Sequence, residues 1–124
     1  MNAELDVNLI DALISLKSWC EKIARIAGEI DFDEFRSKEV LQLALSMAVS
    51  QVGEISGRIV RKWPQFAAEN PAMQLSHAYA MRHRLIHVYE QIDLAILWDT
   101  VTNSIPEMSG AVGTILAANA ESAS

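Results

Sequence analysis

The amino-acid sequence predicts an all-α fold, an antiparallel bundle of four or five helices in a single domain. Of the 124 residues, 51% are apolar and 21% are charged, values typical of a protein with one packed core. The five glycines and three prolines make up about half of their usual share, which disfavours a turn-rich β-sandwich or barrel. Apolar residues recur at helical spacing along the chain, and no segment shows a convincing strand pattern.

The first helix is predicted from about Glu4 to Gly28, where the glycine ends it. Its apolar residues recur at alternating steps of four and three and form one buried stripe: Leu9, Leu13, Leu16, Cys20, Ile23, Ala27 and Ile30. Cys20 lies on this stripe, and we interpret it as an inert core residue. A single cysteine also excludes an intrachain disulfide and a multi-cysteine zinc site.

A short helical turn is predicted at Asp31, because a carboxylate three residues before Glu34 has the spacing of a capping box. A second long helix should then run from about Ser37 to Lys62. Its buried stripe consists of Leu41, Ala44, Leu45, Ala48, Val52, Ile55 and Ile59. Within it, Gly53 and Gly57 are four residues apart, and we interpret them as a place where another helix approaches closely rather than as a ligand site.

Proline positions define the expected boundaries of the next segment. Trp63-Pro64 should end the second helix, because proline donates no amide hydrogen and disfavours helical backbone before it. Residues 65–70 are then expected to form a loop. Asn70 as cap and Pro71 at the first helical position predict a third helix from about Pro71 to His87.

The last part of the chain is predicted to hold a fourth helix and a tail. Asp93 has the character of a helix cap, and Leu94, Leu97, Trp98 and Val101 follow on one face. Pro106 is expected to interrupt this helix. Residues 1–107 should therefore form the bundle, and the small, uncharged residues of 108–124 a frayed or disordered tail, with some helix at most.

Charge is unevenly distributed along the chain. Ten basic against sixteen acidic residues give a net charge of −6, which is not the composition of a nucleic-acid-binding protein. From Arg58 to Tyr89, however, there are five basic residues and one acidic residue, so this segment carries +4 and the rest carries −10. Such a segment can attract a polyanion, or its charges can simply be solvated; the sequence alone favours neither.

The segment Met81 to Tyr89 is the most promising for chemistry, because it holds two of the three histidines, two arginines and a tyrosine. Histidine can exchange a proton near neutral pH, and arginine matches phosphate oxygens with a fixed fork of donors. Together they suit cleavage of a phosphodiester, in which a 2′-hydroxyl loses a proton and the phosphate gains negative charge. No carboxylate cluster lies nearby to hold magnesium, so a metal-free mechanism is the better hypothesis.

Helical geometry complicates a joint role for Arg82 and His87. At about 100° per residue they lie about 140° apart around one helix and do not share a face. Either the helix must end or bend between them, or the site must be composite. A symmetric dimer that pairs two such segments would supply both side chains from both copies.

The run R-H-R-L-I-H-V-Y, residues 82–89, resembles the R-x-x-x-x-H-x-Y signature of the HepT-like HEPN toxins. In that family a polar residue follows the arginine, and His83 fits this place. Several neighbouring segments are also similar to the family pattern: the Gly-Glu segment Gln51 to Glu54, the acidic-Phe turn Asp31 to Phe35, and Asp93, Trp98 and Pro106 after the tyrosine. The resemblance covers about residues 5 to 108. One departure is Leu75, near where the family commonly has a Pro-Trp pair.

The resemblance implies a HEPN-like homodimer and a metal-independent endoribonuclease, the toxin of a toxin–antitoxin pair, with no cofactor. The motif would line a cleft at the dimer interface. Arg82 would stabilise phosphate charge, His87 would act as general acid or base, and His83 would orient one of them or the substrate. The antitoxin would be an MntA-type nucleotidyltransferase. Tyr89 matches the tyrosine that such an antitoxin modifies with adenylate groups, which would block RNA entry by charge and bulk.

Other polar residues have less specific interpretations. Arg84, Arg58, Arg61 and Lys62 are candidates for contacts with the RNA backbone, with a solvated surface as an equal alternative. Glu54 could pair with an arginine of the motif as structural support. His77 we interpret as a surface or core residue without a functional role.

Two competing functions remain open at this point. The chain could be a non-catalytic helical partner or nucleotide-binding subunit of a nucleotidyltransferase. It could also be a metal-binding bundle that uses His83 and His87, four residues apart, with Glu90 close by. The uncharged stretch of 13 residues from Met108 to Ala120 is too short to span a bilayer. No basic segment precedes the first apolar run, so we expect no secretory signal and a cytoplasmic protein. We also expect that the protein contacts neither membrane nor DNA.

Overall fold

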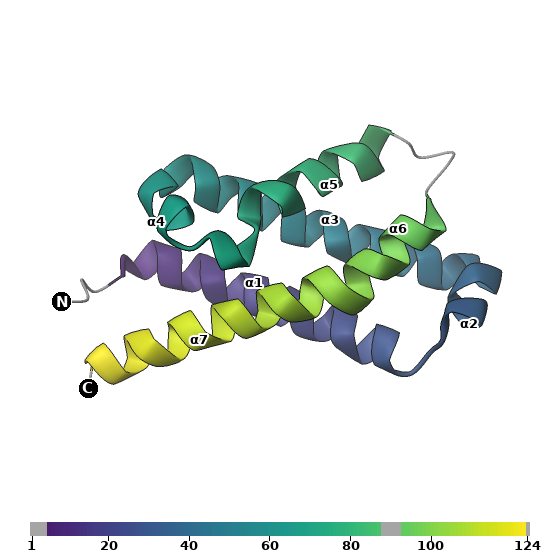
Figure 1. Cartoon of the computed structure of the whole chain (residues 1–124), viewed down its shortest axis with the longest axis horizontal. Helices are drawn as coiled ribbons and strands as arrows, with labels where there is room; N and C mark the ends of the chain where they lie inside the picture. The colour runs from purple at the N-terminus through teal and green to yellow at the C-terminus, as the bar shows by residue number, and fades with distance from the viewer. Residues whose placement is uncertain (1–4, 88–92, 124) are drawn as a thin grey trace.

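The computed structural model describes residues 5–87 and 93–123, and every regular element within them is helical (Figure 1). This confirms the predicted all-α bundle. In chain order the elements are α1 (Val7–Gly28), α2 (Phe32–Ser37), α3 (Glu39–Lys62), α4 (Pro64–Glu69), the 3₁₀ turn η1 (Pro71–Met73), α5 (Leu75–His87), α6 (Leu94–Asp99), the π-helical turn η2 (Thr100–Ser104) and α7 (Ile105–Ala123).

The long helices α1, α3, α5 and α7 form the body of the bundle (Figure 1). Helix α3 packs between α1 and α5, and α7 packs along α1. The core consists of most of the predicted stripes of α1 and α3 together with residues of α6, η2 and α7, among them Leu13, Leu16, Ile23, Leu45, Ile59, Leu97, Val101 and Val112. Ala44, predicted to be buried, is exposed, and Ala27, Ile30 and Leu41 are only partly buried. Helix α5 is therefore held against one side of α3, which fixes where its charged residues lie.

Acidic caps begin three of the helices, as expected for side chains that satisfy free amide groups. The amide of Asn8 donates to Oδ1 of Asp6 at 2.6 Å and begins α1. The predicted caps are confirmed: the amide of Glu34 donates to Asp31 at 2.9 Å, and that of Ile96 donates to Asp93 at 3.1 Å. Between the two capped segments, Phe32 and Phe35 of α2 pack on Trp98 of α6, with ring centroids 6.1 and 5.1 Å away.

The two glycines of α3 mark the contact with α5, as the sequence predicts. A Cβ atom on Gly53 would lie 2.7 Å from the carbonyl oxygen of Ala78 and would overlap the Cβ of Arg82. A Cβ on Gly57 would overlap the ring of Tyr79. The absence of side chains at 53 and 57 thus allows α5 to approach the backbone of α3, and it places Arg82 directly on α3.

The predicted loop at 65–70 and the predicted start of the third helix at Pro71 are both wrong. Pro64 ends α3, but it also occupies the first position of a new helix, α4, where its missing amide hydrogen costs nothing. The side chain of Asn70 donates to the carbonyl oxygen of Phe66 at 2.9 Å, so it closes α4 instead of opening the next helix. Only one 3₁₀ turn follows, and Gln74 in the left-handed region (φ 52°) separates it from α5.

The predicted interruption at Pro106 does not occur. Thr100–Ser104 form a π-helical turn, in which the amide of Ile105 donates to the carbonyl oxygen of Thr100, five residues back. A wider turn relieves the clash that proline makes with the preceding turn of an ordinary helix. The chain therefore passes Pro106 and continues as α7.

The expected frayed tail at 108–124 is instead part of α7, which crosses the proposed boundary between 107 and 108. Met108 and Val112, one turn apart, are buried against the core. The Lys17 ammonium of α1 donates to the carbonyl oxygen and the hydroxyl of Ser109, each at 2.9 Å. The apolar face of this segment, with Ile105, Met108, Val112 and Ile115 at steps of three and four, does have a helical pattern, but the Gly, Ala and Ser residues around it suggested a tail.

Cys20 is fully buried, as predicted for a core residue. Burial raises the pKa of its thiol from 9.0 to about 11, because the thiolate is poorly solvated there. The folded protein should therefore be inert to a disulfide reagent at pH 8 and should react fully once denatured. The thiol ionises at a lower pH in the unfolded chain than in the folded protein. The free energy of unfolding should therefore fall as the pH rises from 9 to 11. Rapid labelling of native protein would contradict this burial.

Candidate active site

Arg82 is held on the surface of α3 by an ion pair between helices. Its Nε lies 3.0 Å from Oε2 of Glu54, and the two side chains are 29% and 43% exposed. Because Gly53, the residue before Glu54, has no side chain, the aliphatic part of Arg82 can pack directly on α3. The pairing that the sequence suggested for Glu54 is therefore present, and it fixes the guanidinium where solvent and substrate can reach it.

The geometry of this pair leaves part of the guanidinium available. Glu54 approaches the Nε edge, and the other two ion pairs in the described ranges, Arg36–Asp33 and Lys38–Glu34, lie on exposed surface around α2. The terminal nitrogens of Arg82 thus carry donors that no other carboxylate in the described residues engages. An arginine with one edge anchored and the other open is well suited to bind a phosphate.

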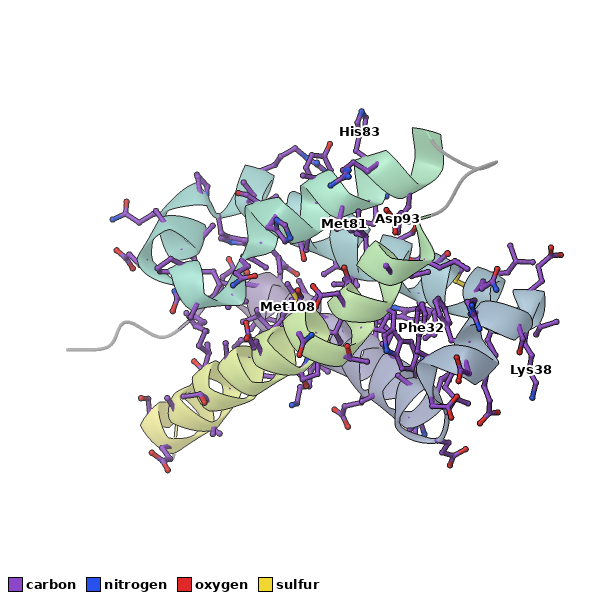
Figure 2. The ribbon with its side chains drawn as sticks, turned by 45° about the vertical axis from the view of Figure 1, so that its right-hand side comes forward. Phe32, Lys38, Met81, His83, Asp93 and Met108 are labelled. Carbon is purple, nitrogen blue, oxygen red and sulfur yellow. The ribbon has the colours of Figure 1, made fainter. Side chains whose placement is uncertain are left out.

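His83 and Arg84 follow Arg82 on α5, and both are exposed. Figure 2 shows the side chain of His83 pointing away from the bundle. His83 therefore lies beside the Glu54–Arg82 pair on open surface rather than in the core. His77, near the start of α5, is also exposed and lines a small apolar hollow beside Met81 and Met108.

The structure describes α5 as far as His87, whose side chain lies outside the described part, as do Tyr89 and Glu90. The backbone is nonetheless informative. Because α5 is an unbroken α-helix from Leu75 to His87, it does not bend between Arg82 and His87. On such a helix the two positions lie about 140° apart, which favours the composite alternative over a site made by one copy.

The remaining candidate cations, Arg58, Arg61 and Lys62, are exposed in the last two turns of α3. The guanidinium of Arg61 lies 5.6 Å from the ring centroid of Tyr79, and the ammonium of Lys62 lies 5.6 Å from that of Trp63. None of the three forms an ion pair with a carboxylate among the residues described. They therefore add positive potential beside the Glu54–Arg82 pair.

These residues belong to one exposed strip, which we call the outer face of α3. It runs from apolar side chains through the Glu54–Arg82 pair to the cations: Val40, Leu43, Met47, Gln51, Glu54, Arg58, Arg61 and Lys62. Their spacing of three and four residues keeps them on one side of the helix. The face thus joins an uncovered apolar surface to a positively charged one, with Arg82 between them.

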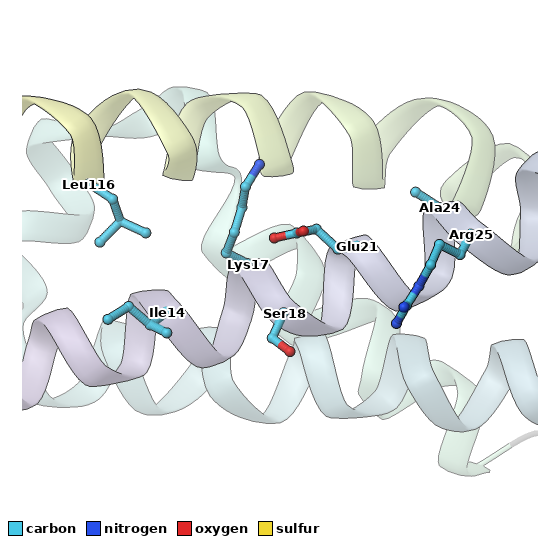
Figure 3. Close-up of a pocket in the computed structure, with 7 residues that line it drawn as sticks. All are labelled: Ile14, Lys17, Ser18, Glu21, Ala24, Arg25 and Leu116. Atoms are coloured by element: carbon cyan, nitrogen blue, oxygen red, sulfur yellow. The ribbon is translucent and has the colours of Figure 1, made fainter.

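An open groove lies elsewhere in the described structure, between α1 and α7. It has a volume of about 510 Å³ and is open to solvent, and Figure 3 shows Lys17 reaching across it from α1 toward α7. Lys17 is already bonded to Ser109 there. This groove holds none of the candidate catalytic residues, so we interpret it as a feature of helix packing.

In the described ranges there is no group of three or more His, Cys, Asp or Glu side chains placed to hold a metal ion. Two of the three residues in the metal-binding alternative, His87 and Glu90, have side chains outside those ranges. Within the same ranges, no helix is long and apolar enough to cross a membrane.

Comparison with known families gives a match over most of the chain. The family described as "Ribonuclease HepT-like" matches residues 16–115, which include the Gly-Glu segment of α3, all of α5 and half of α7. The chain belongs to the HepT-like ribonuclease family. The match extends past residue 108, so the first turns of α7 are also part of the HepT-like domain.

Curated relatives of this HepT-like chain carry ribonuclease names. The protein "Probable ribonuclease HepT" of Thermococcus cleftensis is 31% identical over 100 residues, covering 81% of this chain and 88% of its own length. A "Putative RNase" of Methanocaldococcus jannaschii is 29% identical over 97 residues, covering 77% and 80%. No solved structure matches the chain. The predicted enzyme class, a ribonuclease, thus agrees with the family.

Sequence reasoning found the Glu54–Arg82 pair but missed a second polar hollow of this HepT-like protein. Asn8, Asp11 and Ser15 of α1 face Arg58 and Lys62 of α3 across a small pocket. The only signal in the sequence is the spacing of three and four between the polar residues of α1, on the edge of its apolar stripe. Nothing in the sequence pairs them with residues more than 40 positions away.

Proposed function

We propose that this protein is a metal-independent endoribonuclease in which Arg82 and His87 cleave RNA, and that it acts as the toxin of a toxin–antitoxin pair. The observation that carries the proposal is the Glu54–Arg82 pair, 3.0 Å long, on an exposed surface in a chain of the HepT-like ribonuclease family. The exposed cations Arg58, Arg61 and Lys62 beside it support RNA as the substrate.

Each side chain has a definite task in this reaction. The 2′-oxygen of RNA attacks the adjacent phosphorus while its proton passes to a base, and the bond from phosphorus to the 5′-oxygen breaks as that oxygen accepts a proton. His87 serves as the base or the acid, since histidine can do either near neutral pH. Arg82 stabilises the negative charge that develops on the phosphate oxygens. His83, exposed beside Arg82, orients the substrate.

We further propose that the enzyme is a homodimer and that the second copy covers the apolar part of the outer face of α3, leaving Arg58 and Lys62 open to RNA. Val40, Leu43 and Met47 on this face are 77%, 52% and 57% exposed, an apolar surface that association would bury. Because α5 does not bend between Arg82 and His87, one copy does not bring both residues to one face. A twofold axis near the Glu54–Arg82 pair would bring Arg82 of one copy toward His87 of the other.

The proposed antitoxin is an MntA-type nucleotidyltransferase that modifies Tyr89. Tyr89 follows the end of α5 by two residues, so an adenylate group there would add a bulky anion close to the motif. Such an anion would repel RNA phosphates and occupy the space they need. Toxicity on expression, relieved by that partner, would support this role.

Purified protein should cleave single-stranded RNA in the presence of a metal chelator, and His87→Ala should abolish cleavage. The reason is that the variant lacks the proton-transfer group while its phosphate-binding residues remain. Product formation on a gel measures the effect, and circular dichroism checks that the variant is folded. Cleavage by folded His87→Ala would remove this residue from the mechanism. Tight binding to a nucleotidyltransferase without any RNA cleavage would favour the non-catalytic alternative.

A further inference from the structure

A polar pocket of about 280 Å³ lies between the first turns of α1 and the last turns of α3. Its walls carry Asn8, Asp11 and Ser15 on one side and Arg58, Lys62 and Trp63 on the other. The volume is at the lower end of the range for small-molecule sites, so it would hold a single nucleotide rather than a folded nucleic acid. The mechanism above makes no use of this pocket.

The two cations of the pocket suit a phosphate. Arg58 and Lys62 are one helical turn apart on α3, so their charged ends can reach the same group. Both are exposed, and neither forms an ion pair with a carboxylate of the described residues, although Asp11 lines the same pocket. With two cations against the one carboxylate of Asp11, the described residues of the pocket keep a net positive charge.

The other walls suit a nucleobase. Trp63 is half-buried and packed against the core, which fixes its ring as a surface on which a base can stack. Asn8, Asp11 and Ser15 offer both donors and acceptors from one side of α1. An aromatic ring, two cations and several hydrogen-bonding groups around one small volume match the parts of a nucleotide better than those of a simple anion.

The position of the pocket connects it to the site at Arg82. Arg58 lies one helical turn after Glu54, and Lys62 lies two turns after it. All three residues are on the outer face of α3. At 1.5 Å per residue these positions lie about 6 and 12 Å along the helix from Glu54. That is the scale of one or two steps along an extended single strand. RNA bound at Arg82 would thus pass directly over the pocket.

We propose that this pocket is a subsite that binds one nucleotide of single-stranded RNA flanking the cleaved bond. Arg58 and Lys62 hold its phosphate, Trp63 stacks on its base, and Asn8, Asp11 and Ser15 contact the edge of the base. The proposal rests on the proposed ribonuclease function, and it adds that this enzyme selects its cleavage position through a nucleotide bound away from the catalytic pair.

The test measures binding without cleavage, with a 2′-O-methylated single-stranded oligonucleotide that has no 2′-hydroxyl to react. In fluorescence anisotropy, the double variant Arg58→Ala/Lys62→Ala should bind it about tenfold more weakly than wild type. Its affinity should also depend less on salt, because fewer phosphate contacts release counterions. Arg36→Ala/Lys38→Ala, which removes the same charge from exposed residues around α2, is the matched control and should bind like wild type. Equal losses in both double variants would overturn the proposal.

A second readout does not depend on how well any variant folds. An oligonucleotide of the same length carrying one 5-iodouridine should form a photochemical crosslink to Trp63 in wild-type protein, as located by mass spectrometry. Crosslinks confined to Trp19 or Trp98 would overturn the subsite. A mononucleotide that competes as strongly as the oligonucleotide would also overturn it, in favour of a site for free nucleotides.

The two proposals can fail separately. RNA cleavage by wild type with no loss of oligonucleotide binding in Arg58→Ala/Lys62→Ala would reject the subsite and leave the ribonuclease function intact. The expected binding pattern in a protein that cleaves no RNA would reject the catalytic function and leave a nucleic-acid site in the pocket.

Discussion

Replacing Arg82 with alanine should lower the rate of RNA cleavage by about 10²- to 10³-fold, the usual cost of losing one preorganised donor to a developing charge. The loss should be mainly in kcat, because the donor is needed most when the phosphate carries its extra charge. Arg82→Lys should recover little of it, since an ammonium keeps the charge but cannot bind Glu54 and a phosphate with one rigid fork. The measurement is the initial rate of cleavage of a fluorogenic RNA by wild type, Arg82→Ala and Arg82→Lys.

Two comparisons make this result specific. Arg36→Ala removes a more exposed arginine that pairs with Asp33 around α2, and it should cleave at the wild-type rate. Glu54→Gln keeps the shape of the anchor but weakens the charge-assisted bond to Arg82, so its kcat should fall between those of wild type and Arg82→Ala. Wild-type cleavage by folded Arg82→Ala would show that the pair with Glu54 is structural only.

Replacing Gly53 with alanine should lower the free energy of unfolding by about 1–3 kcal/mol, the usual cost of adding a methyl group to a packed interface. The new Cβ would lie 2.7 Å from the carbonyl oxygen of Ala78, a backbone atom that can move only if α5 moves with it. The substitution should also reduce cleavage, because the same shift displaces Arg82 from Glu54. Chemical denaturation followed by circular dichroism measures the stability.

Gly110→Ala is the matched control for this experiment. Gly110 is also in a helix, α7, but a Cβ there would meet nothing within 4 Å. Alanine is the better helix former, so Gly110→Ala should raise stability by up to about 1 kcal/mol. If Gly53→Ala were as stabilising as Gly110→Ala, the close approach of α5 to α3 would not exist in solution.

The long helices could be predicted from the sequence because each has an apolar stripe that is unambiguous on its own. The stripe of α1 contains Leu13 and Cys20, and the stripe of α3 contains Leu45 and Ile59; all four are fully buried. The glycine spacing in α3 also predicted a helix contact, since small residues four positions apart have few other uses in a helix.

The wrong predictions concern the prolines and the segment rich in small residues at 108–124. At these places the sequence is compatible both with a helix and with a loop or tail. Pro64 ends one helix and begins the next, and only the packing of the segment after it decides between a loop and α4. Pro106 is accommodated because a π-helical turn precedes it. In α7 the many Gly, Ala and Ser residues suggested a tail, although Ile105, Met108, Val112 and Ile115 recur at helical spacing and pack on the core.

The candidate site was predictable where its residues share one short segment or match a family signature. Arg82, His83 and Glu54 were found in this way, and the structure brings Glu54 and Arg82 together. The pocket at Trp63 was not, because Asp11 and Arg58 meet only after α1 has packed along α3. Contacts of such long range leave no local pattern in a single sequence.

The contact between the start of α1 and the end of α7 has a practical consequence. The amide of Leu5, just before α1, donates to the side chain of Asn119 near the end of α7, at 3.4 Å. The start of α1 and the end of α7 therefore emerge side by side, and in Figure 1 they lie far from the C-terminal end of α5. An affinity tag or reporter fused after α7 is thus held away from the motif but lies beside the start of α1, which lines the proposed subsite, so it should be removed before RNA binding is measured.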